Sequence, residues 1–310
     1  SPVPDLSLIS ADAWPDGLDV DALSANLFPL FSTDFERQQW LLAMPDSSQV
    51  ELAFDSGEVT TKDGGYDPIC EVEIELKSGQ TDALFVLARE LAENGGLRLG
   101  NLSKAARGYR LATGYQGDGV KSLSIVDVKS TESTEQAFVT ALEHALEHWH
   151  YHEQIYVERP EQDAIFEMCS AVALIRQVLV LYGGLIPRRA SALLRQELQW
   201  LEGELDWINE ARAIERLVDD KGYFLRKLNV QKPLLSKLGE CYDALPERAE
   251  VLELLHSSRY CNLLLDLSRW ILTRGWQPFL DDKAREKLEE PIRSFANRSL
   301  AVSSDELLSV

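Results

Sequence analysis

The strongest chemical signal in this sequence is a run of alternating acidic and apolar residues. Glu71, Glu73 and Glu75 alternate with apolar residues in the heptapeptide EVEIELK at positions 71–77. Because successive side chains of a β-strand point to opposite faces, the run predicts a strand with three carboxylates on one face. A row of oxygen ligands suits a hard divalent cation, which commonly accompanies phosphate. The alternative is a solvent-facing strand whose glutamates only keep the protein soluble.

Short alternating runs separated by turn residues predict the sheet that positions these glutamates. We expect strands at residues 35–43, 50–54, 58–61 and 69–77. The segments 45–48 and 55–57 have the composition of hairpin turns. The sheet is therefore expected to be antiparallel. A helix is predicted at residues 81–93, which carry an apolar stripe and are followed by two glycines.

The hydrophobic period changes to that of α-helices after residue 130, beyond a glycine-containing segment at 115–119. Helices are predicted at residues 134–157, 162–182, 188–209, 249–274 and 281–299, with a broken region that extends to Tyr242. Five tryptophans at helical spacing are predicted to lie in the core: Trp149, Trp200, Trp207, Trp270 and Trp276. The predicted fold class is α+β, an antiparallel sheet followed by an all-α helical bundle.

Length and composition limit the number of domains and the kinds of partner that the protein can have. A chain of 310 residues with 45% hydrophobic content is long enough for two domains, and its net charge of −20 argues against a nucleic-acid binder. No apolar run is predicted to be long enough to span a bilayer, and residues 171–181, which Arg176 and Gln177 interrupt, are predicted to be a buried helix. The chain starts without a signal-peptide pattern. Four scattered cysteines without CxxC spacing indicate reduced thiols in a cytoplasmic protein, and neither a zinc site nor disulfides.

The helical half contains two sets of polar residues that could bind a ligand. His144, His148 and His152 recur every four residues and share a helix face. A metal site is conceivable there, but a wet helix face is the favoured interpretation. Arg188, Arg189 and Arg195 start a later helix, with Arg176 on the helix before it, and would suit a polyanion. A solvated face with ion pairs is the alternative.

The acidic strand and its surroundings resemble a known family. The segment EIELK at 73–77 satisfies the ExExK pattern of CYTH proteins, which include triphosphate tunnel metalloenzymes, thiamine triphosphatases and class IV adenylate cyclases. It follows TDFERQQW at 33–40 and VELAFDSGEV at 50–59, and it precedes LSKAARGY at 102–109. This order resembles the second half of the CYTH domain of bacterial inorganic triphosphatases. The helical half resembles CHAD, the all-α module that those proteins carry behind the tunnel.

The position of the motif determines the domain prediction. The signature ExExK of the family lies on the first strand, whereas here the motif comes some seventy residues in. The resemblance therefore implies that it is the late acidic strand and that the chain is a fragment. We predict the C-terminal portion of a CYTH tunnel domain at 1–116, a linker at 117–133 and the N-terminal portion of a CHAD-like domain at 134–310.

The resemblance also implies roles for single residues. Glu73 and Glu75 match the metal-binding pair of the late strand, with Glu71 on the same face. The predicted phosphate-binding residues are Arg37, Lys104 and Arg107. Glu51 and Asp55 share a strand face and are possible tunnel acids, although Asp55 also suits a turn. The Ser-Lys segment departs from the more compact family pattern, and Lys77 is expected at the tunnel rim.

These roles predict a function for the parent protein. We expect hydrolysis of inorganic triphosphate to diphosphate and phosphate with Mg²⁺ or Mn²⁺, and a nucleoside triphosphate is another possible substrate. A polyphosphate-binding or scaffold protein without turnover is the alternative. Adenylate cyclase activity is a third hypothesis, for which no base-binding pocket is evident.

Overall fold

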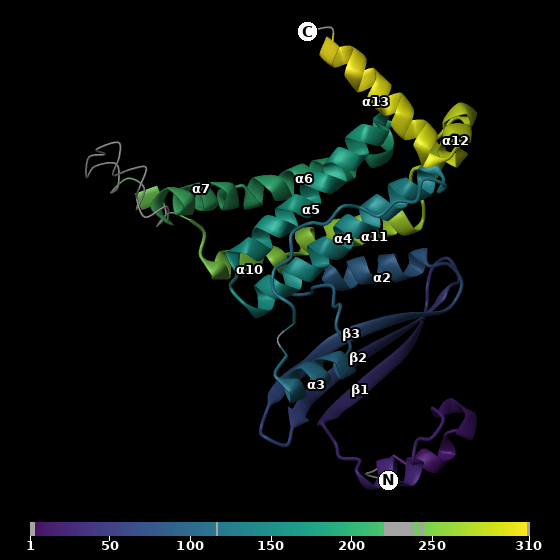
Figure 1. Cartoon of the computed structure of the whole chain (residues 1–310), viewed down its shortest axis with the longest axis vertical. Helices are drawn as coiled ribbons and strands as arrows, with labels where there is room; N and C mark the ends of the chain where they lie inside the picture. The colour runs from purple at the N-terminus through teal and green to yellow at the C-terminus, as the bar shows by residue number, and fades with distance from the viewer. Residues whose placement is uncertain (1–3, 116, 220–236, 238–239, 242–244, 309–310) are drawn as a thin grey trace. The chain divides into compact units, whose positions relative to one another are not determined.

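The computed structural model describes residues 4–115, 117–219, 237, 240–241 and 245–308. The chain forms two compact units (Figure 1). The first unit contains residues Ser1–Ala83 and Gly100–Asp118, and the second contains Leu84–Leu99 and Gly119–Val310. The domain boundaries predicted above stay predictions.

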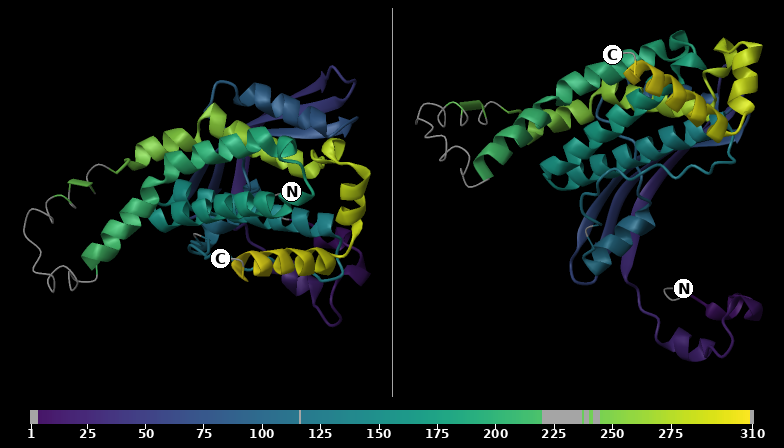
Figure 2. Two further views of the ribbon diagram at one scale, coloured as in Figure 1. Left: turned by 90° about the horizontal axis from the view of Figure 1, so that it is seen from above. Right: turned by 45° about the horizontal axis from the view of Figure 1, so that its top comes forward.

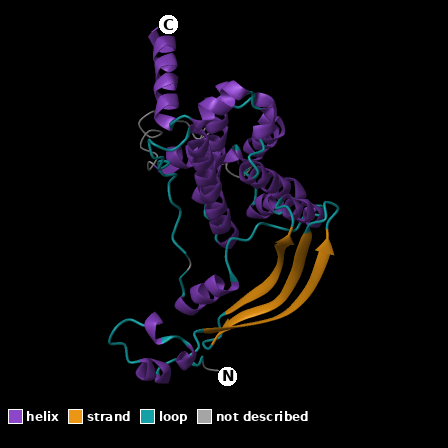
Figure 3. Ribbon diagram, turned by 90° about the vertical axis from the view of Figure 1, so that its right-hand side faces the viewer, coloured by secondary structure: helices purple, strands orange, loops and turns teal. Residues whose placement is uncertain are grey.

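The first unit is built on a three-stranded antiparallel sheet. Its strands are β1 (Phe31–Ala43), β2 (Gln49–Thr61) and β3 (Tyr66–Ser78), in the order β1-β2-β3. Figure 3 shows the three strands side by side and curving together. The predicted antiparallel sheet is confirmed. β1 and β3 begin before the predicted residues, and β2 joins two predicted strands into one.

The turn predicted at residues 55–57 is wrong, since this segment lies inside β2. A Cβ atom on Gly57 would lie 2.1 Å from the carbonyl oxygen of Asp34, so this glycine permits close approach of β1. The real β2–β3 hairpin turn is at residues 62–65, where Gly64 has φ +89°. A glycine required for close strand packing therefore has the same sequence signature as a turn glycine.

A short helix that was not predicted packs on the sheet. Helix α3 (Lys104–Thr113) begins after Ser103, whose hydroxyl oxygen accepts a hydrogen bond from the Ala106 amide at 3.1 Å. Gly108 lies against the ring of Phe31, because an added Cβ would be 2.3 Å from that ring. The Tyr109 ring meets Phe31 edge-on at 5.2 Å. Upstream of the sheet lie η1 (Leu6–Leu8), η2 (Ala11–Ala13) and α1 (Val20–Ala25).

The second unit is helical, as predicted. Its helices are α2 (Asp82–Ala92), whose first two residues belong to the first unit, α4 (Thr134–Glu158), α5 (Gln162–Leu181), α6 (Ala192–Leu205), α7 (Trp207–Asp219), α10 (Arg248–Leu255), α11 (Ser258–Leu272), α12 (Asp282–Glu289) and α13 (Ile292–Leu308). Short 3₁₀ helices are η3 (Tyr182–Gly184), η4 (Arg188–Ser191) and η5 (Gln277–Phe279). The two longest of the described helices, α4 and α5, lie along each other (Figure 2).

Three predicted helices are each split. Residues 188–209 form η4, α6 and the start of α7, and residues 249–274 divide between α10 and α11. Ser257 caps the second of these by accepting from the Tyr260 amide at 3.2 Å. Residues 281–299 divide between α12 and α13 at Pro291, since the residue before a proline avoids helical geometry. The part of the predicted broken region that ends at Tyr242 lies largely outside the described residues.

The core of the second unit confirms two sequence predictions. Trp149 and Trp276 are fully buried, while Trp200, Trp207 and Trp270 are partly buried against the same core. On α5, the predicted buried helix is confirmed because Ala171, Val172, Ile175, Val178 and Leu179 are buried. All four cysteines are free thiols.

One helical segment is long enough and apolar enough to cross a membrane. Among the described residues this is Gln162–Gly184, with a mean hydropathy of 1.8 and half of its most apolar window buried in the protein. The expectation that no segment reaches this length is therefore wrong for α5 and its extension. A buried core helix meets the same two criteria, so they do not separate the two cases.

Candidate functional site

One face of the sheet gathers charged side chains from all three strands. In the strand register Arg37 of β1 lies opposite Asp55 of β2, and Asp55 lies opposite Glu71 of β3. Glu73 follows two residues after Glu71 and shares its face, because side chains two apart point the same way. Opposite charges on neighbouring strands stabilise the pairing, whereas the like-charged Asp55 and Glu71 require cations nearby.

Asp55 is the centre of this group. It accepts hydrogen bonds from Arg37 Nε at 2.7 Å and Arg37 Nη2 at 2.6 Å, and its side chain is fully buried. The Lys104 ammonium lies 2.6 Å from Asp55 Oδ2. Asp55 is therefore a strand residue held by two cations, and the alternative turn role is wrong.

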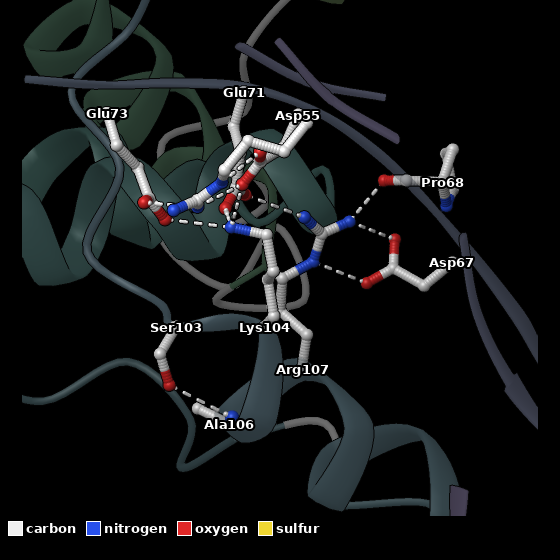
Figure 4. A network of polar contacts seen from close by, with 10 residues as sticks. Asp55, Asp67, Pro68, Glu71, Glu73, Ser103, Lys104, Ala106 and Arg107 are labelled. Atoms are coloured by element: carbon white, nitrogen blue, oxygen red, sulfur yellow. Dashed lines mark hydrogen bonds and ion pairs between the residues drawn. The ribbon is translucent and has the colours of Figure 1, made fainter. Parts of the chain in front are cut away.

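Lys104 is brought to the same carboxylates by the first turn of α3 (Figure 4). Its ammonium contacts Glu73 Oε1 at 2.7 Å and also Glu71 Oε1. Arg37 Nη2 donates to Glu73 Oε2 at 2.6 Å. Arg37, Asp55, Glu71, Glu73 and Lys104 thus form one network, which we call the sheet cluster.

Proton affinities in the sheet cluster follow from these contacts. Hydrogen bonds from Arg37 and Lys104 lower the pKa of Asp55 to about 2, although burial opposes the shift. The pKa of Glu73 is lowered by hydrogen bonds from Lys104 and Arg37. Burial alone would lower the pKa of Lys104, but its hydrogen bonds to Asp55, Glu71 and Glu73 outweigh that effect and raise it. Asp55, Glu73 and Lys104 are therefore charged at neutral pH.

Arg107 lies one helical turn after Lys104 and contacts the start of β3 (Figure 4). Its Nε and Nη2 donate to the two oxygens of Asp67 at 2.7 and 2.8 Å, Nη2 also contacts the Pro68 carbonyl oxygen, and Nη1 donates to Glu71 Oε2 at 3.3 Å. Asp67 was not among the predicted site residues. The signal was present, since Asp67 precedes Glu71 by four residues and shares its strand face.

The remaining predicted acids form a separate group near the end of the strands. Lys77 Nζ lies 3.1 Å from Glu51 and 3.0 Å from Glu75, and Glu75 is 67% exposed. Hydrogen bonding to Lys77 lowers the pKa of Glu51, and hydrogen bonding to Glu75 and Glu51 raises that of Lys77. The structure therefore places Glu75 beside Lys77 and not with Glu73.

The sheet cluster offers oxygen ligands for a cation. Oxygen atoms of Asp55, Glu71 and Glu73 lie within 4.8 Å of one another. Among the described residues this is the only such group of acidic, histidine or cysteine side chains. Three carboxylates fit a hard cation such as Mg²⁺ or Mn²⁺. Lys104 contacts the same three carboxylates, so its ammonium and a divalent cation would compete for them.

The predicted histidines of α4 contact polar groups of the same unit. His144 Nε2 lies 3.1 Å from the Ser124 carbonyl oxygen. His152 is fully buried, its Nε2 accepts from the Lys121 amide at 3.1 Å, and its Nδ1 lies 2.8 Å from the His148 carbonyl. His148 Nε2 lies 3.1 Å from Glu167 Oε2, which also accepts from the Leu123 amide at 3.0 Å. The prediction of a wet helix face is therefore wrong for His152.

The predicted polyanion-binding arginines are differently exposed. Arg188 and Arg189 are exposed, whereas Arg195 donates to Ser191 Oγ at 2.9 Å and to the Leu179 carbonyl at 2.7 Å. Burial and the charges of Arg188 and Arg176 lower the pKa of Arg195, so these cations lie within electrostatic reach of one another. Arg176 forms an ion pair with Glu202.

Comparison with known proteins identifies both parts of the chain. The CYTH domain family matches residues 4–109, and the CHAD domain family matches residues 140–309. An inorganic triphosphatase of Haemophilus influenzae is 42% identical over 91 residues in the CYTH region. This match covers 29% of the chain and spans 25% of the length of that relative.

A solved structure resembles part of the chain. It is the crystal structure of the CHAD domain from the plant Ricinus communis, which is 21% identical, with a TM-score of 0.43 over 62% of this chain and 61% of that chain. This degree of likeness adds no argument about function. The family matches are sufficient to assign the chain to a family, because the CHAD match alone covers more than half of the chain. The chain belongs to the family of proteins in which a CYTH domain is followed by a CHAD domain.

Proposed function

We propose that the protein, at its full natural length, hydrolyses inorganic triphosphate to diphosphate and phosphate with the help of Mg²⁺ or Mn²⁺. The observation that carries this proposal is the sheet cluster, in which three carboxylates and two basic side chains meet on one face. Transfer of a phosphoryl group requires charge neutralisation and alignment more than covalent chemistry by the protein. The similarity to an inorganic triphosphatase over 91 residues supports the same substrate class.

Asp55, Glu71 and Glu73 are the residues that would hold the cation. When bound, a divalent cation polarises phosphoryl oxygens and increases the acidity of a bound water molecule. The low pKa of Asp55 keeps this carboxylate ionised and able to act as a ligand throughout the neutral range. Glu75, which was predicted as a metal ligand, and Glu51, which was predicted as a possible tunnel acid, both contact Lys77 and are left out of the proposed metal site.

Arg37 and Lys104 are the residues that would hold phosphate. Three of the five N–H groups of Arg37 are directed at Asp55 and Glu73, and its Nη1 has no partner among the described residues. Arg37 can therefore donate two hydrogen bonds from Nη1 to phosphate oxygens while it stays anchored. Lys104 has three donors on a flexible stem, so it can exchange a carboxylate for a terminal phosphate.

The test measures phosphate release from inorganic triphosphate and from ATP, with and without Mg²⁺ or Mn²⁺. Glu73→Gln is compared with Glu75→Gln, a matched control two residues away on the same strand face. We expect Glu73→Gln to lower kcat/KM by about 100-fold or more and Glu75→Gln to change it by less than about threefold. Faster release from ATP would reassign the substrate to nucleoside triphosphates. Equal rates in wild type and Glu73→Gln would overturn the proposal.

Binding of polyphosphate by the helical unit is a second candidate function. It is favoured by the electrostatic proximity of Arg176, Arg188 and Arg195, together with the exposure of Arg188 and Arg189. The double substitution Arg188→Ala/Arg189→Ala should weaken polyphosphate binding, and wild-type binding should weaken with added salt. Unchanged affinity in the double variant would exclude these two arginines. A cytoplasmic location without membrane or nucleic-acid partners stays a prediction.

A further inference from the structure

Arg107 differs from the other arginine of the site in how its hydrogen-bond donors are used. Its contacts to Asp67, the Pro68 carbonyl and Glu71 engage four of the five guanidinium N–H groups. Arg37 uses three and keeps both hydrogens of Nη1. The Arg107 side chain is also less exposed, at 18% compared with 36% for Arg37. Arg107 is therefore poorly equipped to bind phosphate.

The anchor of Arg107 is Asp67, which lies near the start of β3. The two hydrogen bonds from Arg107 Nε and Nη2 reach different oxygens of Asp67, the bidentate geometry that most restricts a guanidinium. Arg107 Nη2 also donates to the carbonyl oxygen of Pro68, the residue that follows Asp67. These contacts raise the pKa of Arg107, chiefly through the hydrogen bonds with Asp67. The guanidinium is thereby fixed from one side.

Glu71 contacts both Arg107 and Lys104. Its Oε2 accepts from Arg107 Nη1 at 3.3 Å, and its Oε1 contacts the ammonium of Lys104. Lys104 and Arg107 are three residues apart on α3, so both side chains point to the same strand. Each oxygen of Glu71 is thus assigned to a different cation. Removal of Lys104 from Oε1 would leave Arg107 as the group that orients this carboxylate.

We propose that Arg107 is a positioning residue that orients Glu71 for cation binding, and that Asp67 is the residue that holds Arg107 in place. The inference rests on the proposed function, because it assumes that Glu71 is a metal ligand. It assigns Arg107 to the metal site and not to the phosphate. Residues that orient a metal-ligating carboxylate typically change metal affinity by about 10- to 100-fold when they are removed.

The test measures two affinities separately on the purified protein. Mn²⁺ binding without substrate is followed by titration calorimetry, and inorganic triphosphate binding is measured without metal. The variants are Asp67→Asn, Arg107→Gln and the double variant, with Arg37→Gln as the comparison. We expect Asp67→Asn and Arg107→Gln each to weaken Mn²⁺ binding by about 10-fold and to be non-additive when combined. Triphosphate affinity should change by less than about twofold in Asp67→Asn.

The control and the contrary results separate this inference from the proposed function. Arg37→Gln should weaken triphosphate binding more than Mn²⁺ binding, and Arg107→Lys should not restore Mn²⁺ affinity, because an ammonium cannot contact Asp67 bidentately and Glu71 together. An unchanged thermal midpoint in Asp67→Asn would distinguish positioning from loss of folding. If Arg107→Gln weakens triphosphate binding more than Mn²⁺ binding, or if Asp67→Asn binds Mn²⁺ like the wild type, the inference is overturned. Failure of the wild type to bind Mn²⁺ would instead overturn the metal site of the proposed function.

Discussion

Two polar clusters, one in each unit, use similar residues in opposite ways. In the sheet cluster, the carboxylates of Asp55, Glu71 and Glu73 lie near one another and form ion pairs with cationic side chains, and Glu73 is 50% exposed. His148 and His152 of α4 and Glu167 of α5 form a second group, which we call the histidine cluster. In it, His152 accepts a hydrogen bond from the Lys121 amide, and Glu167 accepts one from the Leu123 amide. Side-chain cations can be exchanged for another cation, whereas backbone amides have no alternative acceptor in a buried position.

This difference separates a site for a ligand from a structural anchor. In the sheet cluster, hydrogen bonds lower the pKa of Asp55 and of Glu73 and so keep these two carboxylates ionised. The histidine cluster keeps its imidazoles neutral, since burial lowers the pKa of His148 and of His152. Because the His152 Nε2 accepts from an amide, its Nδ1 carries the proton that is donated to the His148 carbonyl.

The largest effect on stability is expected at Asp55. Asp55→Ala would leave Arg37 and Lys104 without their shared buried partner, which should lower the free energy of unfolding by about 3 kcal/mol. Hydrogen exchange of the β2 amides should report the loss, with Glu75→Gln as the control. Wild-type protection of β2 in Asp55→Ala would mean that the cluster does not stabilise the sheet.

The next effect is expected in the histidine cluster. His152→Leu removes the acceptor of the Lys121 amide and should lower the free energy of unfolding by about 2 kcal/mol. Urea denaturation followed by tryptophan fluorescence would measure it, and the exposed Glu147→Gln on the same helix is the control. A loss equal to that of the control would show that the segment after Gly119 is held by other contacts.

Mild acid should distinguish the two clusters. The pKa of His152 is depressed below 6.5, so its contribution to stability is complete above about pH 6.5 and is lost as the pH falls toward its folded value. Asp55 contributes above its ordinary value of 3.8 and loses that contribution only as the pH falls toward about 2. Between pH 7 and 5, the protection factor of the Lys121 amide, which is its exchange rate relative to the intrinsic rate at each pH, should therefore fall while the protection factors of the β2 amides do not. A fall in the protection of β2 alone would reverse this assignment.

The smallest effect is expected at Glu75. This residue is 67% exposed beside Lys77, so Glu75→Gln should change the free energy of unfolding by about 0.5 kcal/mol or less. Thermal unfolding at low and high salt would measure it, since salt screens exposed pairs. A loss as large as that of Asp55→Ala would place Glu75 in the sheet cluster after all.

Local pattern was sufficient to predict much of the fold. Period-two alternation predicted the sheet, and the 3.6-residue period predicted the helices, because each pattern reports which faces an element buries. The errors occurred where a local signal has two physical meanings. Gly57 permits close strand packing instead of a turn, and Gly108 lies inside helix α3, where it permits close approach of the Phe31 ring. Proline and capping residues divided helices whose hydrophobic period continued across the break.

The sequence by itself determined which residue types share a strand face: Glu71, Glu73 and Glu75 alternate, and strand geometry requires nothing else. Only the tertiary structure decided which of them act together. The register places Asp55 opposite Glu71, and α3 brings Lys104 and Arg107 onto the same face. It also leaves Glu75 with Lys77. The physical reason is that charge interactions act over a few ångströms, and distances between strands and helices are set by packing and not by sequence spacing.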